Sequence, residues 1–95
     1  MPEMHFHVRW PDGRMQRCYS PSLVIQDFFA PGESYSVAEF VQRSRAALQI
    51  ASERVQRKYG VPCGRSQAQL ADIESAAGEF SGQPRARVTI ALFEF

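Results

Sequence analysis

The chain has 95 residues and a mass of 10.8 kDa, so we expect residues 1–95 to form one domain around one hydrophobic core. Apolar residues make up 44% of the sequence and charged residues 22%, which excludes wholesale disorder. The net charge is only +1, which argues against a dedicated binder of nucleic acid or anionic membranes, because such proteins need a strong positive field.

The sequence also indicates the cellular compartment of the protein. No segment approaches the ~20 apolar residues of a membrane span, and the first residues lack the features of a signal peptide. The two cysteines, Cys18 and Cys63, are too few for a disulfide framework, although one bridge between them stays open as an alternative. We therefore expect a cytoplasmic protein with free thiols and no membrane partner.

The first elements form a predicted β-hairpin. Apolar and polar residues alternate over residues 4–10, as in a half-buried strand, and residues 14–19 return as a second strand. The connecting Pro11-Asp12-Gly13 has turn chemistry and fits a three-residue loop with a bulge at Gly13. In that register Cys18 faces Phe6 on the core side, while both histidines lie on the opposite side.

The next segment is ambiguous. Ser20-Pro21 suits an N-cap followed by proline at the first helical position, which predicts a short helix ending before Pro31-Gly32. The run Leu23-Val24-Ile25 fits a strand equally well. Residues 33–35 are too few to assign.

The strongest helical pattern follows over residues 37–59. Ser36 and Glu39 form a capping box, and Gly60 is a natural terminating residue. One apolar stripe runs along this segment: Val37, Phe40, Val41, Ser44, Leu48, Ala51, Val55 and Tyr59. A helix of this length extends about 34 Å, so we expect part of its surface to lie against a second chain.

A further helix and a last strand complete the chain. Ser66 is the predicted N-cap of a helix with an apolar stripe, and residues 81–84 end it. Residues 87–95 are predicted to be a strand that pairs with the first one and is either central in the sheet or covered on both faces. Alternation assigns Val88, Ile90 and Leu92 to one face, and Thr89, Ala91, Phe93 and Phe95 to the other.

This order of elements predicts an α+β fold, a two-layer sandwich. The N-terminal hairpin and the C-terminal strand would share a small sheet, covered by the long helix and one or two shorter helices.

Two groups of residues suggest chemistry. His5 and His7 share a strand face and could bind a metal, but the sequence supplies no second ligand cluster, so we predict no metal and no cofactor. Cys63 precedes a predicted helix start and stands near Arg65, and both features favour a thiolate. The alternative for Cys63 is a small residue packed in a tight turn.

The hairpin is locally basic and aromatic, with Arg9, Arg14, Arg17, Trp10 and Tyr19. Such a surface could bind an anion or a polynucleotide, but the balanced total charge favours a surface that faces a protein partner. We therefore take His5, His7, Arg9, Trp10, Arg17, Cys63 and Arg65 as candidate ligand- or partner-binding residues.

Three blocks of the sequence resemble a known family. They are the opening residues 1–13 with Val8-Arg-Trp-Pro-Asp-Gly13, then Cys18-Tyr-Ser-Pro-Ser22, and then residues 41–59. The chain resembles a small bacterial nitrogen-starvation-response family that is encoded in nitrilase gene clusters. The resemblance implies enzymes as genetic neighbours, among them a nitrilase, a radical-SAM protein and a flavin oxidoreductase. It implies no catalytic residues.

These observations favour a non-catalytic accessory or scaffold protein, either a homodimer or a subunit of an enzyme from the same gene cluster, with no nucleic-acid partner. The alternative is a small-molecule-binding protein or thiol-dependent enzyme that uses Cys63.

Overall fold

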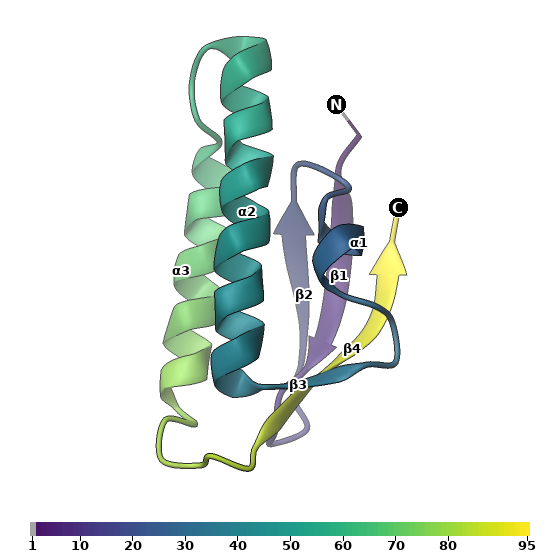
Figure 1. The fold of residues 1–95 in the computed structure, drawn as a ribbon, viewed down its shortest axis with the longest axis vertical. Helices are drawn as coiled ribbons and strands as arrows, with labels where there is room; N and C mark the ends of the chain where they lie inside the picture. The colour runs from purple at the N-terminus through teal and green to yellow at the C-terminus, as the bar shows by residue number, and fades with distance from the viewer. Residues whose placement is uncertain (1) are drawn as a thin grey trace.

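The computed structural model describes residues 2–95 as a layer of helices packed on one face of a four-stranded antiparallel sheet (Figure 1). The elements in chain order are β1 (Met4–Arg9), β2 (Met15–Ser20), α1 (Ile25–Phe28), β3 (Ser34–Ser36), α2 (Val37–Tyr59), α3 (Gly64–Gly78) and β4 (Arg87–Glu94). The predicted α+β two-layer fold is confirmed.

The strands lie in the order β2-β1-β4-β3, so the last strand sits beside the first as predicted. The hairpin register is also confirmed, because Phe6 pairs with Cys18 and His7 pairs with Arg17. Gly13 closes the turn with a φ of 91°, a conformation that favours glycine, and its N–H donates to the Trp10 carbonyl at 2.9 Å. The unassigned segment after α1 becomes the short edge strand β3.

A β-bulge in β4 changes which side chains face the helices. Val8 pairs with Ile90 and His7 pairs with Leu92, which leaves Ala91 as the extra residue. The predicted assignment of faces is therefore wrong beyond Ile90, because one inserted residue reverses the alternation. Phe93, opposite Phe6, faces the core side, while Leu92 and Glu94 face away from the helices.

The core lies between the sheet and the helices. Phe6, Val8, Val88 and Ile90 from the sheet are fully buried, as are Phe40, Ala47, Ala51 and Ile73 from α2 and α3. β4 lies between β1 and β3, which confirms the alternative of a central strand. No helix packs on its outer face within residues 2–95, so the alternative of a strand covered on both faces is wrong.

Helix ends follow local hydrogen-bonding chemistry, and two of the three predicted caps need correction. The Ser36 side chain accepts a hydrogen bond from the Glu39 N–H at 3.1 Å, which confirms the start of α2. Ser20 instead ends β2, and α1 begins after Val24. Ser66 lies inside α3, where its hydroxyl donates to the Cys63 carbonyl at 3.0 Å, and Cys63 is the N-cap.

None of the helices described in residues 2–95 combines the length and the apolar character needed to cross a lipid bilayer.

Candidate functional site

The sheet has an open face, which we define as the strand side chains that point away from the helices. The pairing register places these residues on it: His5, His7, Arg9, Met15, Arg17, Tyr19, Arg87, Thr89, Leu92 and Glu94. Their neighbours along each strand, such as Phe6 and Cys18, are buried beneath the helices. Four of the seven candidate residues from the sequence therefore share one surface: His5, His7, Arg9 and Arg17.

A hydrogen-bonded network lies at the centre of the open face. Glu94 accepts two hydrogen bonds from the Arg17 guanidinium, at 2.9 Å and 3.0 Å, and its Oε1 lies 2.7 Å from His7 Nε2. The Arg17 guanidinium, followed by His7, lowers the pKa of Glu94 to about 2. One carboxylate thus joins three strands, because the three residues come from β2, β4 and β1.

A second cluster surrounds Tyr19 at the edge of the sheet. The Arg65 guanidinium lies 3.8 Å from the centre of the Tyr19 ring, and the His5 ring contacts its edge at 5.6 Å. Burial and then the nearby Glu3 carboxylate raise the pKa of the Tyr19 hydroxyl, and Cys63 is close enough to contribute as well. The fold therefore brings His5, Cys63 and Arg65 around one tyrosine.

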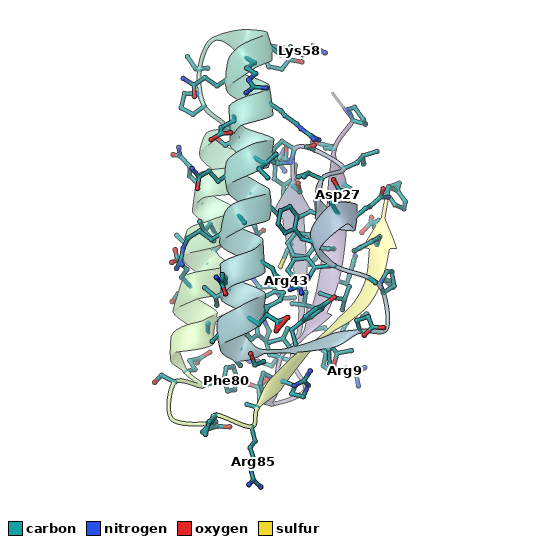
Figure 2. All side chains as sticks on the ribbon, viewed as in Figure 1. Arg9, Asp27, Arg43, Lys58, Phe80 and Arg85 are labelled. Atoms are coloured by element: carbon teal, nitrogen blue, oxygen red, sulfur yellow. The ribbon has the colours of Figure 1, made fainter. Side chains whose placement is uncertain are left out.

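The remaining end of the open face is basic. Arg9 is exposed. In Figure 2 it lies near the lower end of the sheet, whereas Lys58 lies at the upper end of α2. Arg87 is exposed nearby in β4, where it donates to the Ser34 hydroxyl at 3.0 Å and the Ser34 carbonyl at 2.8 Å. Arg9 and Arg87 thus make the end of the open face that lies away from Glu94 positive.

Trp10 does not belong to this surface, which corrects its selection as a surface candidate. Its side chain is 2% exposed, stacks on Phe80 at 5.9 Å and contacts the Phe40 ring edge-on at 5.4 Å. The indole N–H donates to Gln16 at 2.7 Å, so burial leaves no polar group unpaired. Trp10 is a core residue that joins the hairpin to α2 and to the turn after α3.

The two thiols have different surroundings. Cys18 is completely buried, and loss of hydration raises its pKa to about 12. Cys63 is half-buried at the start of α3, and its backbone N–H donates to the Ser52 hydroxyl at 3.2 Å. Both cysteines are free, so no bridge joins them.

Metal ligands are not gathered in the part of the chain that the structure describes, since residues 2–95 contain no group of three or more His, Cys, Asp or Glu side chains around one point. His7 and Glu94 lie together, but Arg17 occupies the remaining side of that carboxylate.

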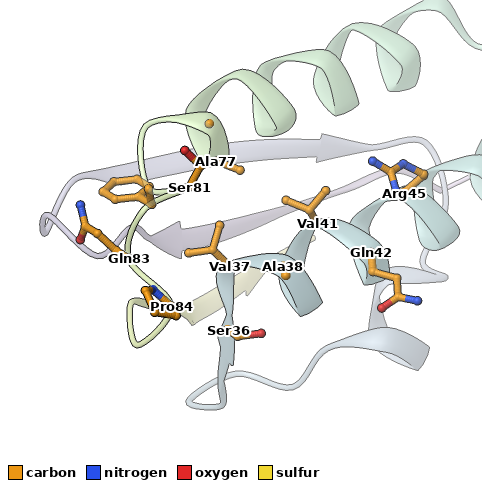
Figure 3. Close-up of a pocket in the computed structure, with 12 residues that line it drawn as sticks. Ser36, Val37, Ala38, Val41, Gln42, Arg45, Ala77, Ser81, Gln83 and Pro84 are labelled. Carbon is orange, nitrogen blue, oxygen red and sulfur yellow. The ribbon is translucent and has the colours of Figure 1, made fainter.

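A groove lies on the helical side, away from the open face. It has a volume of about 670 Å³ and runs between the start of α2, the end of α3 and the loop over residues 80–84. Figure 3 shows Val37 and Val41 of α2 facing Ala77 and Ser81 across it. Its one charged residue, Arg45, is ion-paired with Glu74 at 2.7 Å, and it contains none of the candidate residues.

Sequence reasoning missed Glu94, which organises the central network, whereas it included Tyr19 among the aromatic residues of the basic hairpin. The alternation assigned the neighbours of Glu94 to the wrong faces because it could not foresee the bulge at Ala91. Glu94 is the one acidic residue of β4 and directly follows the apolar run from Ile90 to Phe93, and a charge in that position was the available signal.

Comparison with known proteins identifies a family that this chain matches. The model of a family described as nitrogen starvation-induced protein NitG matches this chain over residues 5–93. Among curated proteins and among solved structures, none is detectably similar to it. Because the match spans nearly the whole chain, this protein belongs to the NitG family of nitrogen starvation-induced proteins.

Proposed function

We propose that this protein is a non-catalytic accessory protein of the nitrogen-starvation response and that it binds a protein partner through its open face. The observation that carries the proposal is the Arg17–Glu94–His7 network, which is held in place across three strands on an uncovered surface. Exposed Met15 and Leu92 flank the network with apolar area. Ordered charges beside exposed apolar side chains are typical of protein-binding surfaces.

The charge of the open face indicates the kind of partner. Arg9, Arg17 and Arg87 stand against the single carboxylate of Glu94, so the face is positive although the whole chain is nearly neutral. An acidic surface on the partner would complement it. We propose an enzyme of the same nitrilase gene cluster as that partner, in the cytoplasm, where free thiols such as those of Cys18 and Cys63 persist.

A charge-reversal experiment tests the proposal. Tagged protein is used to isolate partners from nitrogen-starved cells, with Arg9→Glu compared with Arg57→Glu, which makes the same change on the exposed surface of α2. We expect a cluster-encoded enzyme to be retained by the wild type and by Arg57→Glu, and lost with Arg9→Glu. Equal recovery with both variants, or recovery of no cluster-encoded protein, contradicts the proposal.

A thiol-dependent activity is the second candidate, because Cys63 caps α3 beside Arg65 and Tyr19. Helix N-termini and guanidinium groups both favour the thiolate form. The test is alkylation of the folded protein with iodoacetamide, where Cys63 should react and buried Cys18 should not. This candidate requires Cys63 to react faster than an unstructured cysteine near neutral pH, and a slower reaction removes its support.

A further inference from the structure

The outer edge of β4 is only partly covered. β3 pairs with its first residues, from Arg87 to Thr89, and the segment before β3 exchanges two hydrogen bonds with Ile90. These join the Gly32 N–H to the Ile90 carbonyl at 2.7 Å and the Ile90 N–H to the Glu33 carbonyl at 2.9 Å. β4 continues to Glu94, and within residues 2–95 no strand pairs with this outer edge beyond Ile90 (Figure 1).

This stretch also lacks the usual protection of an edge strand. Natural edges carry free charges or prolines that prevent pairing with another chain. Residues 91–95 read Ala-Leu-Phe-Glu-Phe, and their one charge is held on the open face by Arg17 and His7. Leu92 is 47% exposed and Phe95 is 74% exposed. The edge therefore presents unpaired backbone groups and apolar side chains, and its one charged side chain, Glu94, is already paired.

We propose that this edge pairs antiparallel with the same edge of a second copy of the chain. A twofold axis brings identical residues together, so the strand must tolerate its own sequence opposite itself. Residues 91–95 meet this condition because all are apolar except Glu94, whose carboxylate is already paired with Arg17 and His7 of its own chain. β3 and the Gly32–Glu33 segment block the first half of the edge, which limits the pairing to residues 91–95.

The symmetry fixes the arrangement of the dimer. Antiparallel pairing of identical edges places the twofold axis perpendicular to the sheet, so both helical layers lie on one side. The two open faces then join into one surface that carries two Arg17–Glu94–His7 networks. The pairing would enlarge the docking surface of the proposed function, but it rests on the edge alone and does not require that function.

The contact is small. A strand pair of five residues is about 17 Å long, and the surface area that it buries is smaller than that of a standard protein interface. We therefore expect a weak, concentration-dependent dimer with a dissociation constant on the order of micromolar.

Molar mass measured by light scattering or sedimentation, from about 1 μM to about 1 mM, tests the pairing. We expect the mass to rise from one chain toward two. Leu92→Lys and Phe95→Lys should each remain monomeric, because a lysine on an edge strand prevents pairing with another chain. Met15→Lys is the matched control, since Met15 is 48% exposed on the other edge of the same face, and it should dimerise as the wild type does.

Hydrogen exchange gives a readout that needs no variant. The backbone amides of residues 92–95 as a group should exchange more slowly at high protein concentration, whereas amides of the exposed hairpin turn should not change. A monomer throughout, a dimer insensitive to Leu92→Lys, or a dimer lost with Met15→Lys each overturns the proposal. If Arg9→Glu does not affect partner binding, the proposed function is contradicted but the proposed dimer is not. The two proposals can therefore be tested independently.

Discussion

At the scale of single residues, Glu94 shows how one side chain can organise a surface. It is an exposed carboxylate, yet it makes three contacts, with an arginine and a histidine from two other strands. Bidentate geometry with arginine is stronger and more directional than a simple surface ion pair. Glu94 therefore links the edge strand β2 to β4 across β1.

The lowered pKa of Glu94 predicts a pH dependence. Because the folded-state pKa is about 2 and the ordinary value is 4.5, the ionised carboxylate stabilises the fold above pH 4.5. This contribution is lost as the pH falls from 4.5 toward about 2. The free energy of unfolding of Glu94→Gln, compared with the wild type, should differ most near neutral pH and converge in acid. The effect should be small, since exposed pairs are weakened by solvent.

Titration of the Glu94 carboxyl by NMR checks the cause directly. In Arg17→Gln its pKa should move up toward 4.5, because Arg17 is the largest contributor to the shift. A wild-type carboxyl that titrates near 4.5 would show that the network does not form in solution.

At the scale of elements, α2 is the one most completely specified by local sequence. It begins at the capping box and ends at Gly60, whose φ of 85° is a left-handed conformation that favours glycine. Arg43 pairs with Glu39 one turn away at 3.0 Å and also donates to the Phe28 carbonyl at 2.8 Å. The first turn of α2 is thereby attached to the end of α1.

Removal of the N-cap tests the start of α2. Ser36→Ala should lower the free energy of unfolding by about 1 kcal/mol, because the Glu39 N–H loses its acceptor. The matching fall in Tm is about 4–8 °C for a domain of this size. Urea unfolding followed by the fluorescence of Trp10, the single tryptophan, measures the change. Ser75→Ala, an exposed position inside α3, is the control and should be nearly neutral.

At the scale of the whole molecule, one core holds the two layers together. Ile73 of α3 is fully buried and belongs to the same cluster as Phe6 and Val8 of β1 and Phe40 of α2. Arg14 in the hairpin turn also reaches Glu79 after α3, at 2.5 Å. The helices and the sheet should therefore unfold together.

Truncation of Ile73 tests this coupling. Ile73→Ala should cost about 2–5 kcal/mol, whereas Gln67→Ala on the exposed side of α3 should cost less than about 0.5 kcal/mol. Helical circular dichroism and Trp10 fluorescence should report the same transition midpoint in Ile73→Ala. Two separate midpoints would mean that α3 detaches before the sheet unfolds.

The sequence by itself determined the hairpin, its register and both ends of α2. Each of these depends on residues a few positions apart: the Pro11-Asp12-Gly13 turn, the Ser36–Glu39 cap and the Gly60 stop. Two other predicted caps were wrong because a serine hydroxyl has several local partners, and Ser66 bonds back to Cys63 inside its own helix.

Only the tertiary structure decided the surface that carries the proposed function. Arg17 and Glu94 are 77 positions apart, and their contact depends on the strand order and on the bulge at Ala91. Likewise, Trp10 becomes a core residue because Gln16 satisfies its indole N–H, α2 supplies Phe40 and the turn after α3 supplies Phe80. Local patterns determine local hydrogen bonds, whereas these contacts arise from how distant strands and helices pack together.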